Sequence, residues 1–472
     1  MSIRAERRAL LGPLLLALAS PADAHSFAIS YTLPVPFWLY AQGALMALLA
    51  SFVLVAHRAS PPPALEPEAA PAPLHLSGRV TGLGLLALCI ATGLFGTTQT
   101  TRNFSMTFFW IILLLGVAYL TPLLGDRYAR ANPWRALTDL VSWRSPGLLA
   151  GRRPYPGWLG DWPAVAGYLA LIWLELFGHL RPAGLAWLLL ANTLWLLAGS
   201  WWFGASAWLR HADTLGRFFA LLGRLSPWRH DGRGWRLTGW GAAVYTVPTR
   251  HLSEVVLILA LLSTTAFDGL QSTAAWTALY WRDTLGVLAP LTGQAPVFDY
   301  ARWRGLYMVW ESACLLLSPL IYLACLMLTL ALTRRLLRTS HSLTELACRF
   351  APSLLPIALV YHVSHYFTLL LSQGTRLPSL TSDPFGWGWD LLGLAERWRA
   401  PILLDMSWVW HLQVALILAG HIASVRIAHR EALRVFGDNA RATVSQLPLL
   451  ALMMLFTWSG LWILAQPLQA VR

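Results

Sequence analysis

The recurrence of apolar runs long enough to cross a bilayer constrains this chain more than any other feature. About 20 apolar residues in a helix span the hydrocarbon core of a membrane. Hydrophobic residues make up 56% of the 472 residues, and charged residues make up only 12%. Helices satisfy their own backbone hydrogen bonds within lipid. We therefore expect an all-α, polytopic membrane helix bundle whose main partner is the lipid bilayer.

The apolar runs predict about ten transmembrane helices, separated by short loops that carry most of the charged residues. Apolar length and flanking charge together define such spans. The predicted spans are residues 35–56, 80–97, 104–124, 162–179, 183–209, 253–273, 305–332, 350–373, 406–427 and 446–467.

The first 24 residues have the three parts of a secretory signal. Three arginines precede the short apolar run "LLGPLLLALAS", and the small residues "ADA" end the segment. This pattern predicts a cleaved signal peptide over 1–24, with an uncleaved signal anchor as the alternative. The mature chain, 25–472, is then a single transmembrane domain. Its Pro- and Ala-rich stretch at 57–79 is predicted to be a flexible cytoplasmic linker.

The positive charge indicates an orientation in the membrane rather than a nucleic-acid partner. The chain contains no lysine, and its arginines gather in short loops between apolar runs, so the net charge of +13 does not predict nucleic-acid binding. Cytoplasmic loops are enriched in arginine. Export directed by the signal places the mature N-terminus in the periplasm, and the arginine distribution then predicts a multi-pass protein of the bacterial inner membrane whose C-terminus is also in the periplasm. The predicted cytoplasmic loops carry Arg127, Arg130, Arg135, Arg144, Arg152 and Arg153, then Arg217, Arg224, Arg229, Arg233 and Arg236, then Arg334, Arg335, Arg338 and Arg349, and finally Arg426, Arg430, Arg434 and Arg441.

Several ionisable residues lie within the predicted spans, mostly toward the periplasmic side. Such residues are costly in a bilayer and usually mark a functional site. His362 and His365 are three residues apart, hence on one helix face, and His411 begins the next span. Asp268 and Glu311 lie in the outer parts of two other spans. This set predicts a His-rich metal site with His362, His365 and His411 as ligands, and structural hydrogen bonding is the alternative.

His25 would become the first residue after signal cleavage. Its free amine and its imidazole would then chelate one ion together, as in a copper histidine brace, which makes His25 a further predicted ligand. Imidazole suits both copper and zinc. A zinc ion with an open position activates water for hydrolysis, and Asp268 or Glu311 would be the catalytic base. The metal would reach the site from the periplasm.

Other functions fit the same residues. His362 and His421 lie near mid-membrane in different spans, so they could ligate haem b in a respiratory subunit. A copper-handling protein would use the histidines without hydrolysis. A transporter would use Asp268, Glu311 and the histidines to bind a small molecule or to relay protons. Whether the chain is an enzyme stays open at this point.

The outer loop "DPFGWGWD" at 383–390 holds two tryptophans separated by a glycine. Tryptophan concentrates at the interface between lipid and water. We interpret the loop as an interfacial anchor, with a lid over the outer site as the alternative.

Several sequence blocks are distinctive: "YTLPVPFWLYAQGA", "GDRYARANPWRAL", "FDG", "YHVSHYFTLLLSQG", "SDPFGWGWDLLG" and "LWILAQP". These blocks resemble a bacterial membrane-protein family whose members are labelled fenitrothion hydrolase. The resemblance runs from about residue 24 to the end of the chain, and it implies a membrane-bound hydrolase of organophosphate triesters. It carries over no catalytic residues.

Overall fold

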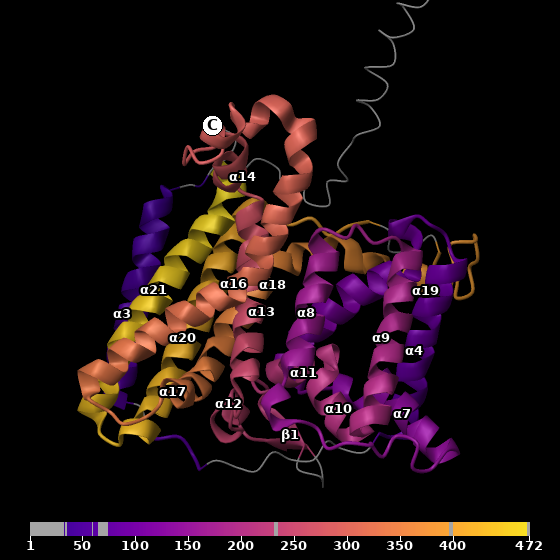
Figure 1. The fold of residues 1–472 in the computed structure, drawn as a ribbon, viewed down its shortest axis with the longest axis horizontal. Helices are drawn as coiled ribbons and strands as arrows, with labels where there is room; N and C mark the ends of the chain where they lie inside the picture. Colours follow the sequence, from indigo (N-terminus) through magenta and orange to yellow (C-terminus); the bar gives the residue numbers. More distant parts are fainter. Residues whose placement is uncertain are drawn as a thin grey trace, which may run out of the picture.

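The expected all-α membrane bundle is confirmed (Figure 1). In this computed structural model the only strands in the described part of the chain are β1 (Trp228–His230) and β2 (Trp235–Leu237), an antiparallel pair. The predicted signal peptide and His25 lie outside the described residues. The structure describes residues 33, 35–58, 60–64, 74–230, 235–395 and 400–469.

Ten helical passages account for the predicted spans within the described ranges. Nine are long and apolar enough to cross a membrane. The exception is α8, whose 15 residues extend about 22 Å, less than the roughly 30 Å hydrocarbon core. The passages are α3 (Phe37–Arg58), α4 (Leu76–Phe95), the continuous α5–η2–α6 (Phe104–Leu124), α8 (Trp162–Leu176), α9 (Pro182–Phe203), α13 (Leu252–Gln271), α16 (Tyr300–Leu337), α18 (Leu355–Gln373), α20 (Met406–Phe436) and α21 (Asn439–Gln469).

The start of α3 and the end of α21 lie at the same end of the bundle. Tyr40 in α3 contacts His411 at the start of α20. The end of α16 contacts the start of α21, where Thr333 donates to the carbonyl of Ser445. Helix α21 runs back along α20, so it ends at the level where α20 and α3 begin. A chain whose two ends lie on one side of a membrane crosses it an even number of times. The short helix α8 is therefore the tenth passage.

Short helices close the two ends of the bundle (Figure 1). We call the end with the β1–β2 pair the inner end, following the orientation predicted from the arginines, and the opposite end the outer end. The inner end carries α7 (Pro133–Arg144), α10 (Ala205–Ala212), α11 (Thr214–Gly223), α12 (Ala242–Thr246) and α17 (Leu343–Phe350). The outer end carries α14 (Ala274–Trp281), α15 (Ala289–Thr292) and α19 (Leu377–Ser382).

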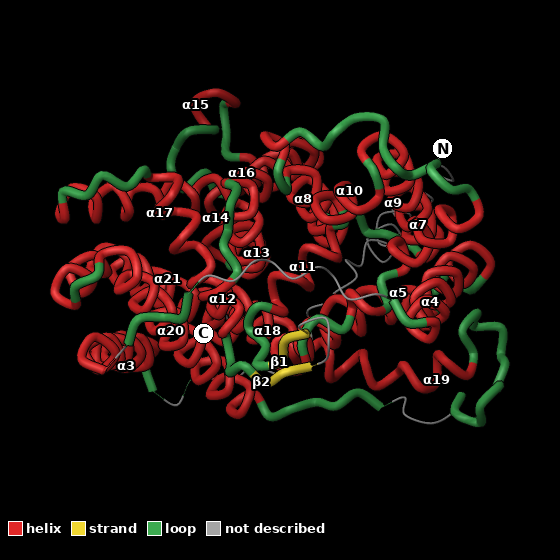
Figure 2. The backbone as a smooth tube through the Cα atoms, turned by 90° about the horizontal axis from the view of Figure 1, so that it is seen from below, coloured by secondary structure: helices red, strands yellow, loops and turns green. Residues whose placement is uncertain are grey.

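Helix α13 occupies the centre of the bundle, between α8, α16 and α18 (Figure 2). Its most apolar window is 89% buried inside the protein, whereas no other candidate span exceeds 50%. A helix shielded from lipid on all sides has room for polar groups only if neighbouring helices supply their partners. Glu254 and Asp268 both lie on this helix and are buried. The packing around α13 therefore defines where a site can form.

The assignment of ends predicts the accessibility of single cysteines. Single cysteines are introduced into a background that lacks the four native cysteines. Leu285→Cys places one between α14 and α15, and Ser340→Cys places one just beyond α16. Both positions are exposed. We expect a membrane-impermeant maleimide to label them from opposite faces of sealed vesicles. Labelling of both from the same face would contradict the ten-passage arrangement.

Candidate functional site

Asp268 is the centre of a buried polar cluster toward the outer end of α13. One carboxylate oxygen lies 2.9 Å from His365 Nε2 and 2.6 Å from the Tyr366 hydroxyl. The other accepts a hydrogen bond of 2.9 Å from Gln271 Nε2. Asp268 is 4% exposed. Three side-chain donors thus replace the water that a carboxylate loses on burial. We call Asp268, His365, Tyr366 and Gln271 the outer cluster.

A small cavity lies beside the outer cluster. His362 and Glu175 both line it, together with Tyr168, and its volume is about 30 Å³. Most of its wall is apolar, but Tyr168, Glu175, Thr214 and His362 supply polar partners, and its size is enough for a water molecule. Glu175 is exposed as well as lining this cavity. His362 is held by Tyr119, whose hydroxyl donates to the His362 carbonyl over 3.3 Å.

The other candidate residues lie elsewhere. Glu311 accepts a hydrogen bond from Trp276 Nε1 at 3.3 Å, among aromatic rings of α14 and α16. His421 is buried and lines a separate cavity with Tyr361. His179 follows α8 with a φ of 42°, a left-handed conformation at the turn into α9. The candidate base Asp268 therefore joins the histidine pair, and Glu311 does not.

His411 does not reach His362 or His365. On α20, Gln413 donates to the carbonyl of Ser364, so that face of α20 points toward α18. His411 is two residues earlier, about 200° around the helix, and contacts Tyr40 of α3. No group of three or more His, Cys, Asp or Glu residues suited to a metal occurs in the described ranges. The copper or zinc set predicted from the sequence thus does not assemble there.

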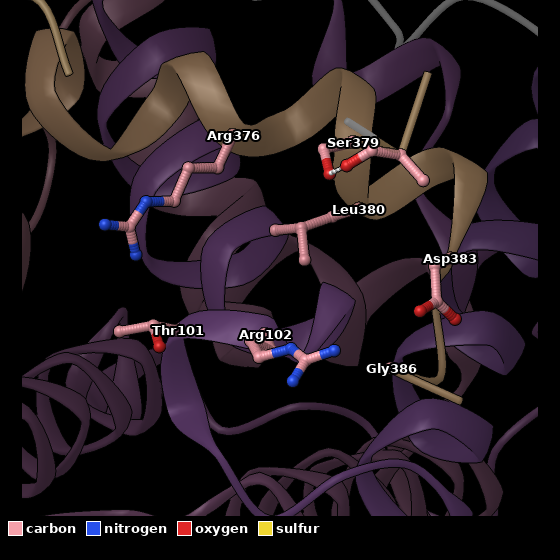
Figure 3. Close-up of a pocket in the computed structure, with 8 residues that line it drawn as sticks. Thr101, Arg102, Arg376, Ser379, Leu380, Asp383 and Gly386 are labelled. Atoms are coloured by element: carbon pink, nitrogen blue, oxygen red, sulfur yellow. Dashed lines mark hydrogen bonds between the residues drawn. The ribbon is translucent and has the colours of Figure 1, made fainter. Parts of the chain in front are cut away.

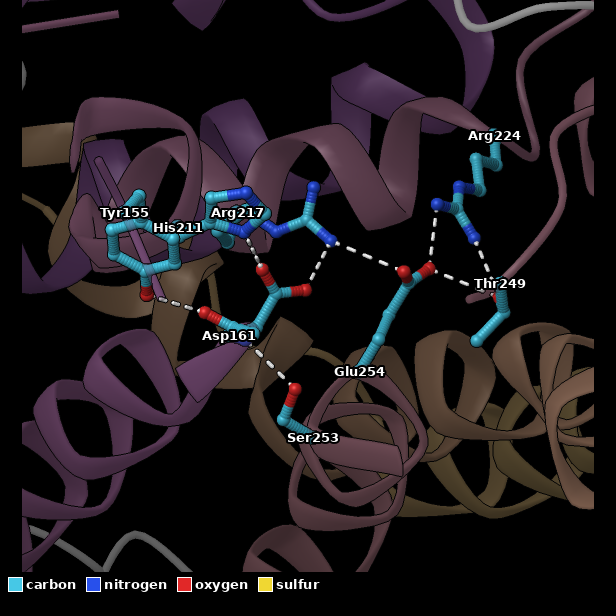
Figure 4. Close-up of polar contacts among 9 residues, drawn as sticks. Tyr155, Asp161, His211, Arg217, Arg224, Thr249, Ser253 and Glu254 are labelled. Carbon is cyan, nitrogen blue, oxygen red and sulfur yellow. Dashed lines mark hydrogen bonds and ion pairs between the residues drawn. The ribbon is translucent and has the colours of Figure 1, made fainter. Parts of the chain in front are cut away.

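A second polar cluster lies at the inner ends of α8 and α13 (Figure 4). Asp161 contacts His211 Nδ1 at 2.6 Å and the Arg217 guanidinium at 2.6 Å. Arg217 also lies 3.4 Å from Glu254, which pairs with Arg224 at 2.6 Å. We call these five residues the inner cluster. Its two carboxylates are matched by two guanidinium groups, so it is close to neutral.

The protonation state of Asp161 follows from its neighbours. Burial alone raises the pKa of this carboxyl group. The hydrogen bond from His211 and the positive charge of Arg217 outweigh burial and hold the pKa below its usual range. Asp161 is therefore ionised at neutral pH. Ser253 assists by accepting a 2.7 Å hydrogen bond from the backbone N–H of Asp161, which joins α13 to the start of α8.

Both clusters include a carboxylate of α13, and the parallel helix α8 also has a carboxyl group at each end. Asp161 and Glu175 are 14 residues apart at the two ends of α8, and Glu254 and Asp268 have the same spacing on α13. That spacing is about 21 Å along a helix. Between the clusters, the hydroxyl groups of Tyr168 and Thr264 lie 3.2 Å apart and link α8 to α13. Polar groups therefore occur at three levels of this helix pair.

The inner cluster was not predicted from the sequence, where Arg217 and Arg224 were counted only as loop charges and His211 had no role. A signal was present, because Asp161 and Glu254 are acidic residues at the starts of apolar runs beside arginine-rich loops. Buried arginines need such partners. Pairing across that distance in sequence required knowledge of which helices are neighbours.

Asp161→Asn tests the inner cluster. Removing one partner of a buried ion pair costs about 3–5 kcal/mol, so we expect a clear fall in the melting temperature of the detergent-solubilised protein. The depressed pKa means that this stability is present above the ordinary carboxyl pKa and is lost as pH falls through the lower folded pKa. The difference in melting temperature between Asp161→Asn and the wild type should therefore become smaller at acidic pH.

The matched control is Asp139→Asn, which removes the exposed ion pair with Arg79. Such surface pairs contribute about 0–1 kcal/mol. Equal effects of the two substitutions would contradict a structural role for the inner cluster.

Comparison with protein-family models, with curated proteins and with solved structures gives no match for this chain. Its function must therefore be inferred from the site itself. The outer cluster, the adjoining cavity and the polar groups along α8 and α13 are the features from which we argue.

Proposed function

We propose that this chain is a proton-coupled membrane transporter. The observation that carries the proposal is the polar column along α8 and α13, in which carboxyl groups lie at both ends and the Tyr168–Thr264 contact lies between them. Intramembrane carboxylates and histidines that face one another or a cavity are typical of proton relays. A small molecule or ion would be the transported partner.

The outer cluster has the groups that a proton acceptor needs. Asp268 and His365 share a 2.9 Å contact, which makes the imidazole the direct neighbour of the carboxylate. Tyr366 donates to the same carboxylate oxygen. Because all three are titratable or hydroxylic, a proton gained by Asp268 is passed on by small rearrangements of hydrogen bonds. Arginine, which stays charged at every accessible pH, is not among the partners of Asp268 that define the cluster.

From Tyr168 toward the outer end of α8, a proton would next pass to Glu175 and to water in the cavity. The cavity is large enough for water, and Glu175 and His362 on its wall are both proton carriers. In the other direction, Tyr168 and Thr264 lead toward the inner cluster. The polar column extends over about 21 Å of the roughly 30 Å hydrocarbon core.

We further propose that the outer cluster faces the periplasm of a bacterial inner membrane, with both termini on that side. The support is the excess of arginine at the inner end. In this orientation, protons enter at the outer cluster and leave near His211.

Asp268→Asn should abolish proton translocation. The amide keeps the size of the side chain but neither accepts nor releases a proton. Loss of a positioned proton-transfer group lowers rates by about a hundredfold or more. The measurement is proton uptake into proteoliposomes that contain a trapped pH-sensitive dye, driven by a potassium-diffusion potential. His365→Gln should have the same effect.

The matched control is Glu311→Gln, a membrane carboxyl group outside the outer cluster. It should retain the uptake of the wild type. Wild-type uptake no faster than in protein-free liposomes, or equal loss in Asp268→Asn and Glu311→Gln, would refute the proposal.

Hydrolysis of an apolar ester is a second candidate, favoured by the Asp268–His365 contact. A carboxylate that orients an imidazole is the arrangement of a general base. The side chain of His365 is 14% exposed, and the resemblance to organophosphate hydrolases points to a phosphate triester as substrate. His365 would take a proton from the attacking water. The metal version of this reaction would need His25, because His411 points away.

For this candidate, purified protein should hydrolyse an aryl dialkyl phosphate triester, and His365→Gln should lower the rate about a hundredfold. His411→Gln should leave it unchanged, since His411 faces α3. We expect the reaction of the Asp268–His365 pair to survive a chelator. Loss of activity on chelation, restored by copper or zinc, would instead favour the His25-containing metal site.

A further inference from the structure

A cavity lies at the outer end of the bundle, apart from both polar clusters (Figure 3). Its volume is about 480 Å³, within the usual range for a small-molecule site. One wall is η1 (Thr100–Arg102), the turn after α4. The other is η7 (Gly374–Arg376), which continues from α18 into α19. Two segments far apart in sequence therefore form this outer pocket.

Two arginines dominate the outer pocket. Arg102 comes from η1 and Arg376 from η7, and Figure 3 shows the two side chains on facing segments, with their guanidinium groups extending in different directions along the pocket. Neither makes an ion pair with a residue in the described ranges. The Thr101 side chain also lines the pocket. Two unpaired guanidinium groups on opposite walls favour an anion between them.

Among the described lining residues, the only carboxylate is already engaged. Asp383 accepts hydrogen bonds from the backbone N–H of Trp387 at 2.9 Å and of Gly388 at 2.8 Å. These bonds hold Asp383 within its own turn. The two arginines therefore outnumber the acidic residue in the described part of the lining, and that part carries a positive charge.

The same turn places the outer pocket at the membrane surface. Trp387 and Trp389 are exposed, and Phe385 stacks on Trp387 with ring centroids 4.5 Å apart. Exposed tryptophans beside transmembrane helices lie at the level of the lipid headgroups. The backbone of Phe385 accepts a hydrogen bond from Thr97, so this aromatic turn is fixed to the loop that carries Arg102.

We propose that the outer pocket binds a phosphate group between Arg102 and Arg376. Planar guanidinium groups recognise phosphate oxygens through paired hydrogen bonds. The phosphate belongs either to the headgroup of an anionic phospholipid or to a soluble phosphorylated molecule. The position beside the exposed tryptophans makes both sources accessible. This site is separate from the outer cluster and does not depend on proton transport.

The double variant Arg102→Gln/Arg376→Gln tests this site in the full-length, detergent-purified protein. In one arm, native mass spectrometry measures retention of added phosphatidylglycerol, with zwitterionic phosphatidylcholine for comparison. In the other arm, the melting temperature is measured with sodium phosphate against sodium chloride at equal ionic strength. Whichever of the two probes the wild type binds, we expect the double variant to bind it about tenfold more weakly, because two charge-assisted contacts are lost.

Arg304→Gln is the matched control, an exposed arginine at the outer end of α16 but outside the pocket. It should behave like the wild type, and the melting temperature of the double variant without probe shows that it folds. Selective loss of phosphatidylglycerol identifies a lipid site, and selective loss of the phosphate response identifies a soluble ligand. Equal responses of wild type and double variant to both probes would overturn the proposal.

Discussion

The cost of holding carboxylates away from water governs the arrangement of this bundle. Asp268 and Glu254 lie on the most buried helix, so each needs partners from neighbouring elements. Asp268 obtains them from α18, and Glu254 obtains them from Arg217 and Arg224 of α11 and its end. These contacts connect α13 to its neighbours at both ends. Apolar packing alone would leave the rotation of each helix less well determined.

Both clusters compensate for the burial of carboxylates, but they use different chemical groups. The inner cluster uses guanidinium groups, whose charge does not change with pH. It therefore stabilises a fixed arrangement of α8, α11 and α13. The outer cluster uses an imidazole and a hydroxyl group, those of His365 and Tyr366, whose hydrogens can be placed differently without moving the heavy atoms. A structural end and a responsive end of α13 suit a protein that moves protons, since the scaffold stays in place while hydrogen bonds at the other end rearrange.

Much of the fold followed from the sequence, because apolar run length depends only on bilayer thickness. The ten passages were predicted, and His362, His365 and Asp268 were singled out by their cost in lipid. The sequence did not reveal the rotation of α20, which turns His411 toward Tyr40. Nor did it reveal that Asp161 meets Arg217. Both depend on which helices are neighbours, and periodicity within one helix does not contain that information.

Helix α18 connects the responsive end to the outer pocket. His365 and Arg376 are 11 residues apart along α18 and η7, about 16 Å at helical rise. Unit charges at that distance interact by about 1 kcal/mol for an effective dielectric constant near 20. An anion held by Arg376 would therefore favour a proton on the outer cluster only about fivefold by electrostatics. Stronger coupling between the two sites would require α18 itself to shift.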